Sequence, residues 1–255
     1  PALAAVERAQ SLFGQGKVAE ALRTLEAQEK AKGTAGRRAR LLLGEYRIAR
    51  GQRAEAQAPL MSLIDDRNND DIADNDAEGL ALAGRAAHLL RSPKDANALF
   101  NQSEKVEKGR LETLRYRAEL FLDKDDFGHA EEVLKEALAK AEKDPELLVL
   151  LARVKLGQAL DFDGAKELAQ KALAVDPGHP EAHGILAGVA LRDGDIAACE
   201  AAIEKGLARN PNHLELRSLK AAARFLAEDR PGFEAQKRAV LAANPSYARF
   251  YAIVA

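Results

Sequence analysis

The sequence predicts an all-α protein, an α-solenoid in which similar pairs of helices stack one after another. Small residues recur with a period close to 34, at Ala9, Gly44, Gly84, Ala118, Ala152, Ala187, Ala221 and Ala255. Twelve residues after most of them stands a second small residue: Ala21, Ala56, Ala96, Ala130, Ala165 or Cys199. A fixed period in this range is typical of stacked repeats. Small residues at two fixed points allow two antiparallel helices to approach closely within each unit.

The composition supports this fold class and excludes several functions. Charged residues make up 31% of the chain and aromatic residues 5%, which is typical of a helix-rich globular protein rather than a β-sandwich or a disordered tail. A net charge of -2 gives no basic face for nucleic acid. No apolar run reaches the roughly 18 residues of a membrane span. Cys199 is the only cysteine, so the chain forms no internal disulfide.

Residues 111–144 are the clearest unit. Residues 111–122 place apolar side chains at helical spacing, at Leu111, Leu114, Ala118, Phe121 and Leu122. After a polar turn at residues 123–126, a second amphipathic segment carries Phe127, Ala130, Val133, Leu134, Ala137 and Leu138. Two helices joined by a short turn form an αα-hairpin, which needs a neighbouring hairpin to bury its second face.

Turn signals separate the predicted helices. Gly14, Gly16 and Gly194 lie where a first helix ends and its partner begins, and glycine accepts the left-handed backbone of such turns. Between the units, Pro177 and Pro211 follow directly after a helix. Proline cannot continue that helix, so each one marks a break.

The pattern resembles the tetratricopeptide repeat family. The small residues at the eighth and twentieth positions, the glycine-containing turn and the closing proline all have counterparts in this chain. The resemblance implies a right-handed α-solenoid with repeats at about 2–35, 37–70, 77–110, 111–144, 145–179, 180–213 and 214–247, and a partial eighth at 248–255. It is most specific in residues 111–211.

The two ends of the sequence suggest a fragment of a longer protein. The chain begins at Pro1 rather than methionine, and it stops after the start of a further helix in residues 244–255. We expect a monomer, or weak self-association through the apolar face of that last helix. Cytoplasmic and periplasmic locations both remain open, because the native N-terminus is expected to be absent.

Two motifs suggest metal ions and are better explained otherwise. His179 and His183 are four residues apart, but Pro180 starts a helix between them, and a third ligand is missing. Asp74, Asp76 and Glu78 imitate the start of a calcium loop, yet its twelfth position would be Arg85. We therefore expect solvated loop residues, no metal and no other cofactor.

The sequence contains no catalytic constellation. No basic residue beside Cys199 would generate a thiolate, so this cysteine is expected to pack as a small apolar side chain. Asn101 begins a glycosylation sequon, a motif that arises often by chance. This segment is therefore not predicted to be an enzyme.

Glutamates occupy the second position of five repeats. They are Glu78, Glu112, Glu146, Glu181 and Glu215. Such a column could form a binding rim, but carboxylates in a first turn also interact with the helix dipole, and we favour this simpler role.

The candidate binding site follows from the family resemblance, in which the first helices of the repeats line a concave groove. The side chains at the matching positions are Arg85, Arg115, Glu119 and Arg153 above a floor of His88, Leu122, Leu156, Leu191 and Phe225. An apolar floor with arginines above it suits a peptide or helix that bears acidic residues or a free carboxylate. The equally favoured alternative is that these arginines pair with glutamates of neighbouring repeats.

The predicted function is a protein-interaction scaffold that binds a peptide or helix of a partner protein. The alternative is a non-catalytic accessory array of a larger enzyme, such as a peptidase or glycosyltransferase. The lysine and asparagine clamp by which some family members grip chaperone tails has no counterpart at the matching positions of this chain.

Overall fold

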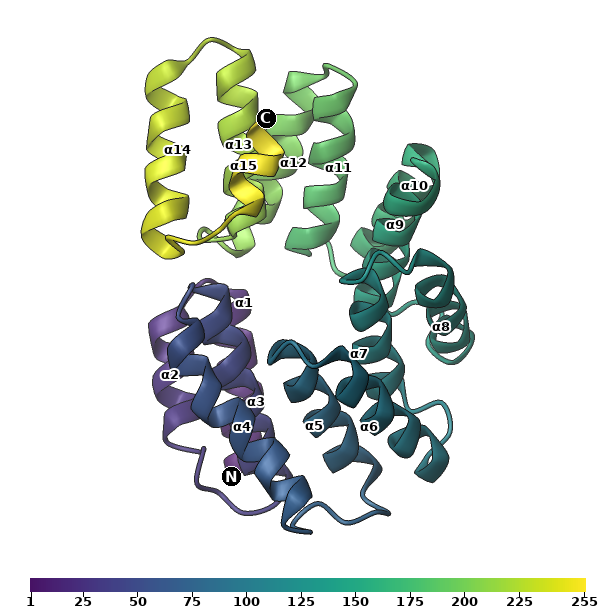
Figure 1. Ribbon diagram of the computed structural model, residues 1–255. Coiled ribbons are helices and arrows are strands. Elements are labelled where there is room, and N and C mark those ends of the chain that lie inside the picture. The colour runs from purple at the N-terminus through teal and green to yellow at the C-terminus, as the bar shows by residue number, and fades with distance from the viewer. The chain divides into compact units, whose positions relative to one another are not determined.

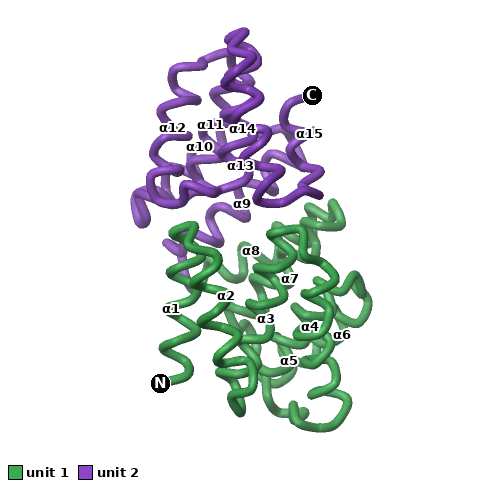
Figure 2. Tube along the Cα trace, turned by 90° about the vertical axis from the view of Figure 1, so that its left-hand side faces the viewer, with its two compact units in different colours: residues 1–140 green, residues 141–255 purple.

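The computed structural model describes residues 1–255 as fifteen helices without strands, in two compact units, residues 1–140 and 141–255 (Figure 1, Figure 2). Unit 1 contains α1 Ala2–Gly14, α2 Val18–Glu26, α3 Thr34–Ala49, α4 Arg53–Asn68, α5 Ala77–Leu89, α6 Pro93–Val106, α7 Leu111–Leu122 and α8 Phe127–Lys140. Unit 2 contains α9 Pro145–Ala159, α10 Phe162–Val175, α11 Pro180–Arg192, α12 Ile196–Arg209, α13 Leu214–Leu226, α14 Arg230–Ala243 and α15 Arg249–Val254. The predicted all-α fold is confirmed, and no helix is long and apolar enough to cross a membrane.

Each unit is built of helical hairpins stacked in two layers. The first helices contact one another along one layer, α1 to α3 to α5 to α7 in unit 1 and α9 to α11 to α13 to α15 in unit 2. The second helix of each hairpin packs against its own partner, and α2, α4, α6, α10 and α12 also pack against the first helix of the next hairpin. This stacking supplies the second apolar contact that a single hairpin lacks.

The columns of small residues bring the two helices of a hairpin together. A Cβ added at Gly44 would lie 2.4 Å from the Leu60 side chain, and one at Gly84 would lie 2.6 Å from the Phe100 ring. In another hairpin alanine fills the position, as Ala187 does beside Ile203 in one core cluster. Gly84 thus leaves room for the large Phe100 ring, and Ala187 packs beside the smaller Ile203.

Each hairpin turn contains one residue with a left-handed backbone. Glycine holds this conformation at Gly16, Gly51 and Gly194, as the sequence predicts for Gly16 and Gly194. In the other four turns the residue carries a side chain: Arg91, Asp125, Leu160 or Glu228. These four turns depart from the glycine pattern and hold a conformation that costs a side-chain-bearing residue about 1 kcal/mol.

The last helix has a partner within the chain. α15 lies against α13, and its Phe250 is buried in a cluster with Ala221 and Val240. Phe250 is therefore not free for the self-association expected through the apolar face of this helix, because α13 and α14 together cover that side chain. Tyr251 on the same helix remains exposed.

Candidate partner-binding site

In unit 1 the predicted groove arginine Arg85 is neutralised. Its guanidinium lies 2.7 Å from carboxylate oxygens of both Glu45 on α3 and Glu119 on α7. Burial opposes the charged form, but these carboxylates outweigh it and raise the pKa of Arg85. The Tyr116 ring lies 5.4 Å from the guanidinium carbon. Arg85 thus joins three neighbouring first helices, as the alternative prediction of pairing across repeats describes.

The other predicted residues of unit 1 lie around this ion pair. His88 is buried, and its Nε2 lies 2.9 Å from Oδ2 of Asp123, a hydrogen bond that lowers the pKa of Asp123. The guanidinium of Arg115 lies 5.2 Å from the centre of the Tyr116 ring. Leu122 is partly buried at the end of α7. The structure therefore brings these residues together on one face, with its charges largely compensated.

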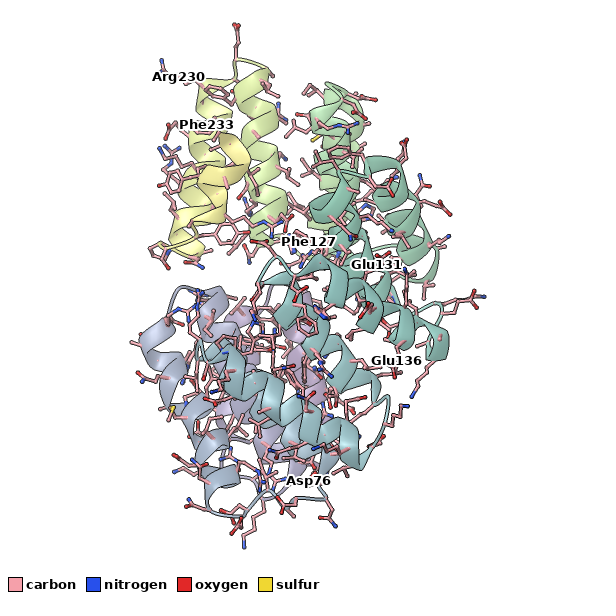
Figure 3. All side chains as sticks on the ribbon, turned by 45° about the vertical axis from the view of Figure 1, so that its right-hand side comes forward. Asp76, Phe127, Glu131, Glu136, Arg230 and Phe233 are labelled. Atoms are coloured by element: carbon pink, nitrogen blue, oxygen red, sulfur yellow. The ribbon has the colours of Figure 1, made fainter.

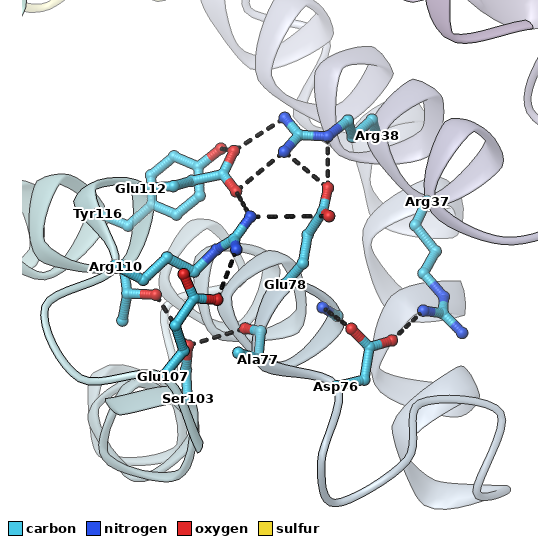
Figure 4. A network of polar contacts seen from close by, with 12 residues as sticks. Arg37, Arg38, Asp76, Ala77, Glu78, Ser103, Glu107, Arg110, Glu112 and Tyr116 are labelled. Carbon is cyan, nitrogen blue, oxygen red and sulfur yellow. Dashed lines mark hydrogen bonds and ion pairs between the residues drawn. The ribbon is translucent and has the colours of Figure 1, made fainter. Parts of the chain in front are cut away.

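A second network in unit 1 joins the glutamate column to arginines (Figure 4). Arg38 on α3 donates to Glu78 at 2.7 Å and to both oxygens of Glu112, at 2.8 and 3.0 Å. Arg110, the N-cap residue of α7, lies 3.6 Å from Glu78 and 3.4 Å from Glu112. Two carboxylates and two guanidiniums thus alternate along the first turns of α5 and α7.

The acidic loop before α5 is likewise occupied by arginines. Asp76 caps α5 by accepting from the Gly79 amide, and its other oxygen lies 2.6 Å from Nη1 of Arg37 (Figure 4). Asp74 forms an ion pair with Arg67. The carboxylates that imitate a calcium loop therefore serve to start a helix and to hold neighbouring elements together.

In unit 2 histidines occupy the place of Arg110. His179 and His213 are the N-cap residues of α11 and α13, and each Nδ1 lies 3.4 or 3.3 Å from the backbone amide three residues ahead, from which it accepts a hydrogen bond when the ring is neutral. The Nε2 of His213 lies 3.3 Å from Glu181 in the first turn of α11. His179 Nε2 lies 3.4 Å from Glu146 in the first turn of α9, an ion-pair distance without a hydrogen bond.

The environment of His179 favours its protonated form. The ring is buried, which opposes a charge, but Glu146 and Glu181 flank it and raise the pKa of His179 to about 9. In the protonated ring Nδ1 faces Glu181 at 3.2 Å as a donor and no longer accepts from the Ala182 amide. The same contacts lower the pKa of Glu181. His183 points elsewhere, with Nε2 2.9 Å from the Pro177 carbonyl, and burial lowers its pKa. The two histidines of the candidate metal motif thus have separate partners.

In unit 2 the layer of first helices contains Arg153, whose charge is less compensated than that of Arg85. Arg153 on α9 lies 3.9 Å from Glu215, whose closer partner is Arg249 at 2.8 Å. The Arg153 side chain is 36% exposed. Its charge is therefore available to a partner to a greater degree than that of Arg85.

The neighbouring first helix, α11, presents small and apolar residues. Gly188 has open space where a Cβ would stand, and Leu191 lies one helical turn further along the same side. Leu191 and its α9 counterpart, Leu156, are both partly exposed. We refer to Arg153, Leu156, Gly188 and Leu191 as the inner face of unit 2.

Phe225 differs from the other predicted floor residues. It is 61% exposed at the end of α13, and its ring centre lies 5.7 Å from that of Phe233 on α14, which Figure 3 labels. Phe233 in turn lies 6.2 Å from the buried Phe250. Phe225 thus belongs to an aromatic chain at the last hairpin.

The cations that pair with the glutamate column were not predicted from the sequence. Arg110, His179 and His213 each stand two positions before a column glutamate, which is the signal that identifies them. Cys199 is buried, as predicted, and burial raises the pKa of its thiol to about 11.

A model of the tetratricopeptide repeat family matches residues 158–223. The fold is similar to a tetratricopeptide repeat protein from Parabacteroides merdae, with 14% identity, a TM-score of 0.64 and coverage of 98% of this chain and 96% of that one. PilF from Pseudomonas aeruginosa shares 17% identity with a TM-score of 0.58, over 85% of this chain and 95% of PilF. A thermophilic repeat protein from Thermus thermophilus shares 18% identity, TM-score 0.60, over 70% and 98% of the two chains. No curated protein matches the sequence.

Proposed function

Because the chain has the fold of tetratricopeptide repeat proteins and a model of that family matches residues 158–223, we propose that it is a protein-interaction scaffold that binds a partner segment on the inner face of unit 2. The repeat fold is typically non-catalytic, and a binding role requires no reacting group. The observations that carry the proposal are the open space over Gly188 on α11 and the partly exposed Arg153 on the neighbouring helix α9. Such a surface allows a partner's backbone to approach α11 closely.

The partner is a peptide or helix with apolar side chains and at least one carboxylate. Leu156 and Leu191 offer apolar contacts on adjacent helices, and the Arg153 guanidinium presents donors that match a carboxylate. The corresponding arginine of unit 1 lacks this capacity because Glu45 and Glu119 occupy its donors.

The test is to fill the open space without disturbing the core. We expect Gly188→Trp to abolish capture of the partner from the native source, since a bulky side chain there covers the inner face. The matched control is Gly128→Trp, because Gly128 on α8 also has no atom within 4 Å of an added Cβ. Circular dichroism should show the same helix content for both variants.

Arg153→Glu separates the charge from the shape of the site. We expect this variant to lose an acidic partner while its thermal melt stays close to that of the wild type. Equal recovery of the partner by wild type, Gly188→Trp and Arg153→Glu would contradict the proposal.

A further inference from the structure

The last hairpin and α15 carry exposed apolar side chains that a series of ring contacts connects. Phe225 and Leu226 at the end of α13 are 61% and 59% exposed, and Tyr251 on α15 is 55% exposed. Phe233 on α14 links them, because its ring contacts Phe225 and the buried Phe250, whose edge meets Tyr251. We refer to Phe225, Leu226, Phe233 and Tyr251 as the aromatic end surface.

Phe233 stands where the other hairpins of unit 2 have a small buried residue. It lies four positions after the N-cap Asp229, as Ala165 follows Asp161 and Cys199 follows Asp195. Ala165 and Cys199 are completely buried, whereas Phe233 is partly exposed. A ring in this position adds to the exposed apolar surface, and exposed apolar patches mark interaction sites.

Cations outnumber carboxylates in the segment that carries the aromatic end surface. Residues 214–255 hold seven lysines and arginines against four acidic residues, although the whole chain has a net charge of -2. The Lys237 ammonium lies 5.9 Å from the centre of the Phe233 ring and 4.0 Å from a carboxylate oxygen of Glu234. Arg230, three positions before Phe233 on the same side of α14, is exposed and forms no ion pair (Figure 3). These cations favour a partner with carboxylates.

A helix is the form of partner that this surface fits. Helical neighbours offer no free strand edge with which an extended segment could pair, whereas an amphipathic helix makes its own backbone hydrogen bonds and needs only an apolar surface. α15 already shows such a contact, because this short helix lies on α13 and buries one aromatic side chain, Phe250, between Ala221 and Val240. A second amphipathic helix that covers Phe225 and Leu226 would repeat this contact.

From this apolar surface and its charge we propose that the aromatic end surface binds an amphipathic helix of a partner protein whose polar face is acidic. The apolar side chains of that helix cover Phe225, Leu226 and Tyr251, and its carboxylates face Arg230 and Lys237. This surface is separate from the inner face around Gly188.

Two synthetic helical peptides test the proposal against the whole chain. Both carry leucine and phenylalanine at positions i, i+3, i+4 and i+7, one with glutamates and the other with lysines on the polar face. In fluorescence anisotropy, we expect the glutamate peptide to bind at least about tenfold more tightly than the lysine peptide. The two cations, Arg230 and Lys237, attract the glutamates and repel the lysines. Equal binding of the two peptides would overturn the proposal.

Surface variants locate the contact. We expect Phe225→Ser with Tyr251→Ser to weaken binding of the glutamate peptide by at least about tenfold. Leu160→Ser, which removes another highly exposed leucine, and Gly188→Trp should leave it unchanged. Arg230→Glu with Lys237→Glu should reverse the preference between the peptides. Unchanged binding by the Phe225 and Tyr251 variant would place the contact elsewhere.

Light scattering tests the alternative that a second copy of the chain, and not a partner helix, covers the aromatic end surface. The proposal requires one monomeric mass for the wild type and the variants at the concentrations used for binding. A wild-type dimer that Phe225→Ser dissociates would overturn it, because the surface would then be a self-association interface.

Discussion

The two units place different residues in the same structural position. At the start of α7 in unit 1, Arg110 stands between Glu78 and Glu112, whereas at the start of α11 in unit 2, His179 stands between Glu146 and Glu181. Both cations join the first turns of adjacent first helices. The arginine stays charged at all working pH values, but the histidine titrates. The same contact between repeats is therefore independent of pH in unit 1 and dependent on pH in unit 2.

A similar exchange occurs in the cores and turns. Unit 1 combines Gly84 with Phe100 where unit 2 combines Ala187 with Ile203. Within unit 2 the α11–α12 turn uses Gly194, and the α9–α10 turn uses Leu160 in the same left-handed conformation. The repeat architecture thus fixes a requirement at each position, and several residues can meet it.

The largest effect is expected from the core exchange. Gly84→Ala places a Cβ 2.6 Å from the Phe100 ring and should destabilise unit 1 by about 2 kcal/mol. Adding Phe100→Ile imitates the Ala187 and Ile203 pair of unit 2 and should restore most of the loss. Urea unfolding measures both variants. If Gly84→Ala alone were as stable as the wild type, the Phe100 ring would be able to move aside and the predicted clash would be wrong.

The next largest effect is the pH dependence of unit 2. The pKa of His179 is raised to about 9 in the folded chain, above about 6.5 in the unfolded chain. Its stabilisation, of order 2 kcal/mol, is therefore complete below pH 6.5 and lost as pH rises through 9. Cys199, with a pKa of about 11, stays neutral in this window.

Hydrogen exchange, corrected for intrinsic rates, measures this effect in each unit. Protection of α9, α11 and α13 should fall between pH 6.5 and 9, whereas α3, α5 and α7 should keep theirs. A parallel fall in both units would show that the histidine does not cause the loss.

Exchanging the two cations should transfer the pH dependence. His179→Arg should make protection of α11 less sensitive to pH, with a change of about 1 kcal/mol at pH 9. Arg110→His should give α7 a new sensitivity over the same range. The same exchange measurement checks both variants, and unaltered profiles would contradict the equivalence of the two positions.

The smallest effect is expected in a turn. Leu160 is 68% exposed with a φ of 50°, so Leu160→Gly removes little packing and relieves the left-handed strain. Thermal unfolding should show a gain of about 0.5 to 1 kcal/mol. Gly194→Leu is the reverse exchange and should lose a similar amount.

Most of the fold could be predicted from the sequence because it depends on local periodicity. The spacing of Ala118 and Ala130 indicates a helical hairpin, and glycines such as Gly194 mark the turns. The partners of the arginines could not be predicted in this way. Glu45, Arg85 and Glu119 lie on three different first helices and meet only when those helices stack.

For the candidate site, too, the sequence predicts the positions of the residues but not their partners or exposure. The sequence places Arg85 and Arg153 at the ninth position of their repeats, and Leu191 and Phe225 at the twelfth. Only the structure distinguishes them: Arg85 is neutralised, Arg153 keeps an exposed side chain, Leu191 is partly buried and Phe225 joins an aromatic surface. Side-chain exposure depends on the neighbouring hairpin, which a repeat pattern does not describe.

The sequence by itself determined that this protein is a stack of helical hairpins, because small and apolar residues at fixed intervals leave few other ways to bury the apolar faces. Tertiary structure decided which charges compensate one another and which surfaces remain open. The physical reason is that ion pairs and exposed patches depend on distances between separate helices, and these distances are set by packing, not by spacing along the chain.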